Sequence, residues 1–97
     1  MYTIEQLRKM ITPIAKKHGV KSVALFGSYS RGEATEKSDV DLIILKGKIE
    51  TLFQLIGFRL DVEDALNPPV DVVTYTNPDK EFLSMIKSDE VLLYESA

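Results

Sequence analysis

The sequence contains no cysteine and only one histidine, His18. These shortages exclude disulfides, thiolate metal sites, cysteine nucleophiles and an imidazole cluster for zinc, so any metal ion must be held by oxygen ligands. No apolar run approaches the ~18 residues that cross a bilayer, and the N-terminal residues do not resemble a cleaved signal sequence. We therefore expect a cytoplasmic protein with no membrane partner.

An excess of positive charge is absent as well. Twelve lysines and arginines stand against fifteen aspartates and glutamates, which gives a formal net charge of −3. A chain with this balance has no overall basic field to attract a phosphate backbone, so direct binding of nucleic acid is not expected. The length of 97 residues allows a single domain, 1–97, and a hydrophobic content of 44% is sufficient for a modest core.

Hydrophobic periodicity and turn residues divide the chain into alternating helices and strands. The predicted elements are a helix at 3–18, a strand at 20–26, a loop with one or two helical turns at 28–38, a strand at 39–45, a helix at 51–66, a strand at 70–75, a short helix at 78–86 and an edge strand at 91–94. This order is typical of an α/β (α+β) fold in which a small mixed β-sheet is flanked by helices.

The first predicted helix contains a proline. Thr3 and Gln6 fit a capping box at its start, and Gly19 supplies a stop. Pro13 lacks the backbone N–H that a helix interior uses, so the helix either kinks there or restarts with Thr12 as its cap. The sequence leaves both alternatives open.

The helix at 51–66 is apolar on two sides. At about 100° per residue, one face contains Leu52, Phe53, Ile56 and Leu60, and a nearly opposite face contains Leu55, Phe58, Val62 and Leu66. We expect the first face to cover the sheet. The second face packs either against the first helix or against another protein chain, and we predict the latter, with a second copy or a different partner as the occupant.

Three aspartates form a candidate metal site. Because side chains alternate along a strand, Asp39 and Asp41 share one face, and Val40 points to the other. Asp71 lies among valines in the third predicted strand, where a charge is costly unless it is paired or bound to a metal. Oxygen ligands from neighbouring strands suit Mg²⁺, and a pair of such ions serves phosphoryl or nucleotidyl transfer. We therefore predict that Asp39, Asp41 and Asp71 are catalytic residues and ligands of two Mg²⁺ ions.

A glycine and a serine end the first predicted strand. Gly27 allows the backbone to approach a triphosphate closely, and the amides and hydroxyl around Ser28 can donate hydrogen bonds to its oxygens. Arg31, one turn further on, would add a bidentate phosphate contact, although an exposed surface charge explains it equally well. These three residues are the predicted nucleotide-binding set.

Together these motifs resemble the signature of the polymerase-beta-like nucleotidyltransferase superfamily, and within it of the minimal nucleotidyltransferases. The resemblance is carried by Phe26-Gly27-Ser28-Tyr29-Ser30-Arg31-Gly32-Glu33-Ala34, Ser38-Asp39-Val40-Asp41-Leu42 and Pro69-Val70-Asp71-Val72-Val73. It implies Mg²⁺-dependent transfer of a nucleoside monophosphate to a hydroxyl, with AMP from ATP as the expected group. In this resemblance Asp39 and Asp41 share the metal ions, and Asp71 activates the acceptor hydroxyl. Gly27 and Ser28 form the triphosphate turn.

The resemblance also implies a partner. Minimal proteins of this kind in prokaryotes typically pair with a HEPN-domain RNase toxin encoded beside them and act as its antitoxin, and some are similar to protein adenylyltransferases that place AMP on a partner tyrosine. We therefore expect an enzyme that transfers AMP to a partner protein encoded nearby. Two alternatives stay open, namely a non-catalytic antitoxin that acts by occlusion and a transferase that acts on a small molecule.

Overall fold

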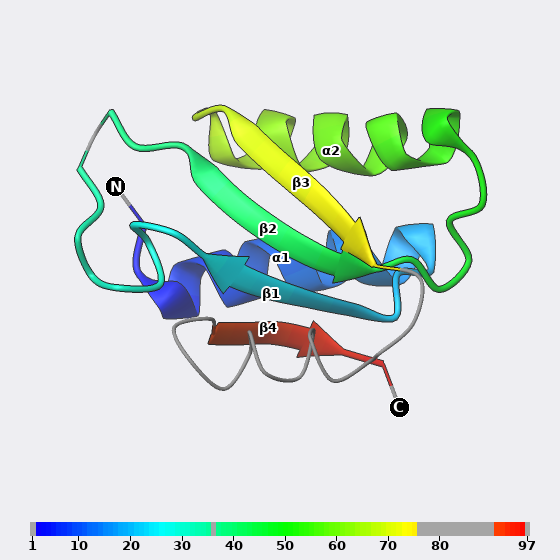
Figure 1. Cartoon of the computed structure of the whole chain (residues 1–97), viewed down its shortest axis with the longest axis horizontal. Helices are drawn as coiled ribbons and strands as arrows, with labels where there is room; N and C mark the ends of the chain where they lie inside the picture. The colour runs from blue at the N-terminus through cyan, green and yellow to red at the C-terminus, as the bar shows by residue number, and fades with distance from the viewer. Residues whose placement is uncertain (1, 36, 76–90, 97) are drawn as a thin grey trace.

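The computed structural model describes residues 2–35, 37–75 and 91–96 of the chain. Its elements follow in the order α1 (Ile4–His18), β1 (Ser22–Phe26), β2 (Val40–Leu45), α2 (Leu52–Leu66), β3 (Val70–Tyr75) and β4 (Val91–Glu95) (Figure 1). The predicted order of elements is confirmed for these residues, and the helix predicted at 78–86 lies outside them. Neither α1 nor α2 is long and apolar enough to span a bilayer.

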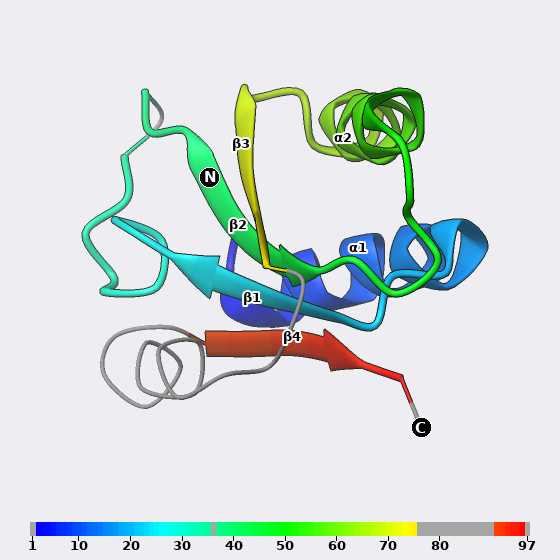
Figure 2. The ribbon, with the colours of Figure 1, turned by 45° about the vertical axis from the view of Figure 1, so that its right-hand side comes forward.

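The strands form one mixed sheet in the order β3-β2-β1-β4. β1 pairs antiparallel with β2 and β4, and β2 pairs parallel with β3 after the crossover through α2. Figures 1 and 2 show both helices on the same side of this sheet. The helices contact each other, α1 also contacts β4, and α2 contacts β3. The predicted small mixed sheet flanked by helices, with 91–94 in an edge strand, is confirmed.

Helix α1 is continuous through its proline. The capping box is present as predicted, with the Thr3 hydroxyl accepting a 3.1 Å hydrogen bond from the Gln6 N–H. Gly19 ends the helix in the left-handed conformation, with φ 71°. Pro13 lies inside the helix, so a restart after Thr12 is wrong. A continuous helix keeps its apolar stripe on one side, which outweighs the hydrogen bond that proline cannot make.

The hydrophobic core lies between the helices and the sheet. Its fully buried side chains include Leu7 and Ile11 of α1, Val23 and Leu25 of β1, Val40, Leu42 and Ile44 of β2, and Phe58, Val62 and Leu66 of α2. The three residues of β2 alternate along the strand, as expected for side chains that face one side of a sheet. This alternation takes the intervening Asp41 out of the core.

The two apolar faces of α2 are the reverse of our prediction. The face expected to bind a partner, represented by Phe58 and Val62, is fully buried in the core. The opposite face is exposed, and we call it the outer face of α2: Leu52, Phe53, Ile56 and Leu60. Both faces are apolar, so the sequence pattern does not determine which of them packs against the sheet. The choice depends on how α2 crosses from β2 to β3, which is a property of the tertiary fold.

A polar cluster joins α1 to α2. The Asp61 Oδ2 atom accepts a 3.2 Å hydrogen bond from Lys17 Nζ and lies 2.7 Å from His18 Nε2. The His18 ring also packs edge-on against Phe58, with 5.7 Å between the ring centroids. The hydrogen bond to His18 and then that to Lys17 hold the pKa of Asp61 below its usual value. His18 therefore contributes to the packing of α1 against α2.

Candidate active site

Two of the predicted carboxylates meet where β2 and β3 begin. The parallel register pairs Asp41 of β2 with Asp71 of β3, and residues paired in register project to the same side of a sheet. Val40, the neighbour of Asp41, is fully buried in the core, as the predicted alternation requires. The two carboxylates therefore lie side by side at one end of the sheet.

Asp39 adds a third negative charge just before β2. It is exposed and lies two residues from Asp41. Partial burial raises the pKa of the Asp41 carboxyl, and the charges of Asp71 and Asp39 and a hydrogen bond to Asp71 raise it further. The charges of Asp39 and Asp71 thus both reach Asp41.

The glycine-serine turn at the end of β1 lies against the same carboxylates. Phe26 pairs with Asp41 across β1 and β2, which brings the following Gly27 beside the Asp41 side chain. Gly27 has a left-handed φ of 75°, and a Cβ atom at this position would collide with the Asp41 carboxylate. The Ser30 hydroxyl donates a 2.8 Å hydrogen bond to the Gly27 carbonyl, and Ser28 is half-buried. The structure therefore brings the predicted phosphate turn to the predicted carboxylates.

A cleft of about 510 Å³ opens beside the two paired carboxylates, a size typical of ligand sites. Asp41 and Asp71 share its lining with residues of β1, α2 and β3: Phe26, Leu52, Leu55, Ile56, Arg59, Val72 and Val73. Arg59 brings a positive charge to this lining, and its Nε donates a 2.7 Å hydrogen bond to Glu63 Oε1. The cleft therefore combines an acidic end with an apolar wall.

The contribution of α2 to this cleft was missed in the sequence. Leu52, Leu55, Ile56 and Arg59 follow one another at the i, i+3, i+4 and i+7 spacing of a single helical stripe. This spacing can be recognised in the sequence. It indicates a wall of the cleft only when the position of α2 beside β3 is known.

Arg31 lies outside the cleft. Its side chain is 45% exposed, and its Nε lies 3.4 Å from Glu33 Oε2. It lines a separate depression of about 370 Å³, together with Ser30 and residues at the start of α1. The structure does not bring Arg31 to the carboxylates, and its contact with phosphate stays a prediction.

The carboxylates that line the cleft suit a hard cation. Asp41 and Asp71 provide adjacent carboxylates. Partial burial and then the charges of Asp71 and Asp39 raise the pKa of Asp41, and a bound cation would relieve the repulsion among these charges. Across 2–35, 37–75 and 91–96, no three His, Cys, Asp or Glu side chains gather closely enough to enclose a metal ion. Mg²⁺ fits such an open arrangement, because it retains waters and binds through one or two carboxylates plus substrate phosphates.

Asp41→Asn should stabilise the metal-free protein at neutral pH. The raised pKa means that the ionised Asp41 carboxylate is less favourable in the folded chain than in the unfolded chain. This penalty is absent below the ordinary aspartate pKa of about 4 and is complete above the raised pKa. In chelator at neutral pH the variant should melt at or above the wild-type temperature, and the difference should vanish below about pH 4. A clearly lower melting temperature at neutral pH would show that Asp41 supports the fold instead.

Comparison with known proteins identifies the family. A family model described as "Polymerase beta, Nucleotidyltransferase" matches residues 9–97, and the chain belongs to this nucleotidyltransferase family. A protein of Methanocaldococcus jannaschii, provisionally named a protein adenylyltransferase, is 39% identical over 74 residues, covering 76% of this chain and 80% of the relative. Protein adenylyltransferase MntA of Thermococcus cleftensis is 35% identical over 77 residues, covering 75% of this chain and 78% of the relative.

A solved structure has the same fold. It is a complex of a tri-AMPylated HEPN toxin with an MNT antitoxin from Shewanella oneidensis. The match has a TM-score of 0.68 and 17% identity, and it covers 97% of this chain and 74% of the matched chain. Together with the family model, this likeness confirms the predicted polymerase-beta-like nucleotidyltransferase fold.

Proposed function

We propose that the protein is a Mg²⁺-dependent protein adenylyltransferase that moves AMP from ATP to a hydroxyl of a partner protein. The observation that carries this proposal is the close approach of Gly27 to Asp41, with Asp71 in register beside it. One small region thus holds a phosphate turn and two adjacent carboxylates. The names of the two relatives support a protein as the acceptor.

Some of the site residues are proposed to bind the nucleotide, and others to act on the acceptor. In the proposed arrangement Gly27 and Ser28 bind the triphosphate through backbone amides and the serine hydroxyl. Asp41 and Asp71, with Asp39 beside them, would hold Mg²⁺, with two ions expected, and Asp71 also faces the acceptor. When bound, Mg²⁺ supplies neutralisation of the phosphate charge and a lower pKa of the attacking hydroxyl.

Asp71 is the proposed base. It takes the proton of the acceptor hydroxyl as the hydroxyl oxygen forms a bond to the α-phosphorus of ATP. The bond from that phosphorus to the bridging oxygen breaks, and pyrophosphate leaves with the electron pair. Asp71 is exposed, as a base must be when its substrate is a side chain on another protein. The product is a phosphodiester between AMP and the acceptor.

The proposed partner is a HEPN-domain toxin, with this chain as its antitoxin. The fold shared with the complex of a tri-AMPylated HEPN toxin and an MNT antitoxin supports this choice. The test is to incubate the protein with ATP labelled at the α-phosphate, Mg²⁺ and the product of the adjacent open reading frame, which we expect to be a HEPN-domain protein. We expect label on a tyrosine of that protein and a loss of its RNase activity that requires ATP. Inhibition without ATP or label would favour occlusion, and label in a low-mass product would favour a small-molecule acceptor.

A comparison of Gly27→Ala with Gly32→Ala distinguishes the effect of backbone strain from the effect of displacing the Asp41 carboxylate. Gly27 and Gly32 have φ of 75° and 72°, so alanine should cost each variant ~1–2 kcal/mol of stability. A Cβ at Gly32 meets nothing within 4 Å, whereas a Cβ at Gly27 displaces the Asp41 carboxylate. We expect AMP transfer to fall about 100-fold in Gly27→Ala alone, because misplacing a reacting group by about 1 Å has an effect of this size. Equal rates for the two variants would contradict the role of Gly27.

A further inference from the structure

Two residues of the outer face of α2 also line the candidate active-site cleft. Leu52 and Ile56 line the cleft with Asp41 and Asp71. The same two residues are 69% and 40% exposed, so they also belong to the outer surface. The apolar wall of the cleft and the exposed apolar side of the helix are therefore one continuous surface.

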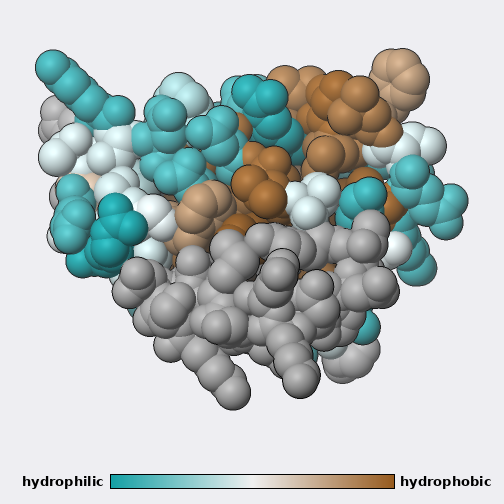
Figure 3. Space-filling model, in the orientation of Figure 1, coloured by the Kyte–Doolittle hydropathy of each residue, from teal (hydrophilic) through white to brown (hydrophobic). Residues whose placement is uncertain are grey.

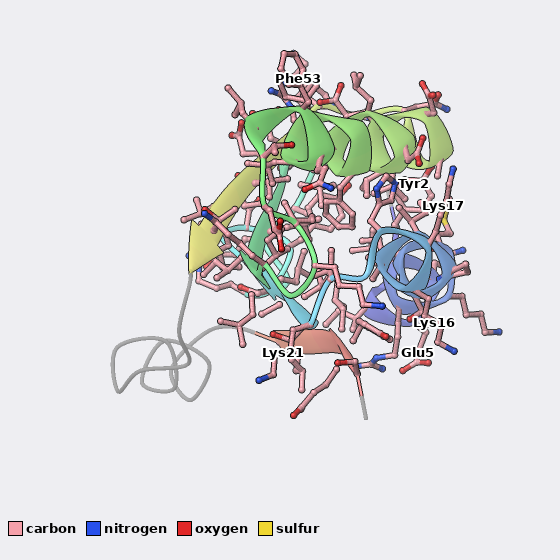
Figure 4. All side chains as sticks on the ribbon, turned by 90° about the vertical axis from the view of Figure 1, so that its right-hand side faces the viewer. Tyr2, Glu5, Lys16, Lys17, Lys21 and Phe53 are labelled. Carbon is pink, nitrogen blue, oxygen red and sulfur yellow. The ribbon has the colours of Figure 1, made fainter. Side chains whose placement is uncertain are left out.

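Phe53 and Leu60 extend this surface away from the cleft. They are 87% and 52% exposed, and the ring of Phe53 points outward from α2 (Figure 4). Val73 of β3, which is 44% exposed, adds an apolar side chain on the strand side of the cleft. Figure 3 shows hydrophobic residues gathered over α2. A contiguous exposed apolar area on a small protein marks an interaction site.

We infer that the outer face of α2 is the docking surface for the acceptor protein and that it binds an apolar patch beside the hydroxyl to be modified. This inference rests on the proposed function. A protein that covers Leu52 and Ile56 also covers the apolar end of the cleft, and a hydroxyl that it carries into the cleft can reach Asp71 at the acidic end. The nucleotide, held by its phosphates at Gly27, does not require an apolar surface that extends to Phe53.

We do not assign this face to a second copy of the chain. A copy bound to the outer face would occupy Leu52 and Ile56, the apolar wall of the cleft, without supplying the hydroxyl to be modified. A free small molecule does not fit either, because it cannot span from the carboxylates to the outward-pointing ring of Phe53. The partner is therefore a different protein with an apolar contact surface.

Phe53→Lys tests the docking surface, and Ala65→Lys is its matched control. Both variants place a lysine at an exposed position of α2 with the same change in charge, and only Phe53 belongs to the outer face. Phe53 also lies outside the cleft lining. The measurements are the Kd for the HEPN-domain protein, KM and kcat for AMP transfer, the rise in Tm with Mg²⁺ and ATP, and the sedimentation mass. We expect Phe53→Lys to raise Kd and KM for the acceptor at least ~10-fold, with kcat and the Tm shift unchanged. Ala65→Lys should match the wild type.

Several outcomes would overturn this assignment. Equal affinities for the acceptor in both variants would do so, as would a wild-type protein that does not bind the HEPN-domain protein. A wild-type dimer that Phe53→Lys dissociates would show that the face joins two copies. If the wild type binds the acceptor through Phe53 but transfers no AMP, the docking surface stands and the proposed enzyme fails.

Discussion

Replacing Asp41 with asparagine should reduce AMP transfer at least ~100-fold, which corresponds to ~2.7 kcal/mol of transition-state stabilisation. Asp41 is paired in register with Asp71 and lies against the turn at Gly27. The charge of Asp39 contributes to the raised pKa of Asp41. Losing its charge removes the proposed metal ligand at the centre of the site. Initial rates of label transfer from ATP to the acceptor measure the effect. Asp39→Asn and Asp71→Asn should each cause a loss of the same kind.

Asp64→Asn is the matched control for Asp41→Asn. It removes the same group from an exposed position of α2 that does not line the cleft, so it should transfer AMP at the wild-type rate. Because Asp41→Asn is expected to melt at or above the wild-type temperature in chelator, a loss of activity would not reflect unfolding. An Asp41→Asn variant that keeps more than about a tenth of the wild-type rate, a loss below ~1.4 kcal/mol, would end its assignment as a catalytic ligand.

Phe58→Ala should lower the free energy of unfolding by ~3–5 kcal/mol. Phe58 is fully buried, and it packs against the edge of His18 between the two helices. Its removal leaves a cavity where α1, α2 and the sheet meet. For a domain of this size each kcal/mol shifts Tm by roughly 4–8 °C, so the variant should melt well over 10 °C below the wild type. Denaturant unfolding measures the loss directly.

Phe53→Ala provides the comparison on the same helix. It deletes the same ring from a position that is 87% exposed, so its stability should remain within about 0.5 kcal/mol of the wild type. The pair thus reports which side of α2 faces the core. Similar losses of stability in the two variants, or a greater loss in Phe53→Ala, would contradict the packing described here.

The part of the site that depends on short stretches of sequence was predictable. Gly27 and Ser28 follow an apolar strand, and Asp41 lies next to a buried valine in the following strand, so strand alternation places its side chain outside the core. Asp39 lies just before that strand. Asp71 was singled out as a costly charge among valines, but the structure exposes its side chain, and the register of β3 is what places it beside Asp41. Local strand geometry was sufficient for Gly27 and Asp41.

The parts that depend on packing between elements were not predictable. Both faces of α2 are apolar, and only its path from β2 to β3 determines that Phe58 faces inward and Phe53 outward. Arg59 and the apolar wall of the cleft follow from that same path. The continuity of α1 through Pro13 likewise depends on how the rest of the fold holds its apolar stripe. Hydrophobic periodicity indicates that a helix has a buried side. When two sides are equally apolar, it does not indicate which of them is buried.

The place of β3 at the edge of the sheet makes one half of the candidate site easier to open than the other. In the order β3-β2-β1-β4, β3 pairs with β2 alone, whereas β2, which carries Asp41, is paired on both sides. Local opening at an edge involves fewer contacts than unfolding of the whole domain. Separation of β3 would remove Asp71 while the paired β1 and β2 keep Gly27 beside Asp41. We therefore expect partial unfolding to remove the proposed base before the predicted phosphate turn.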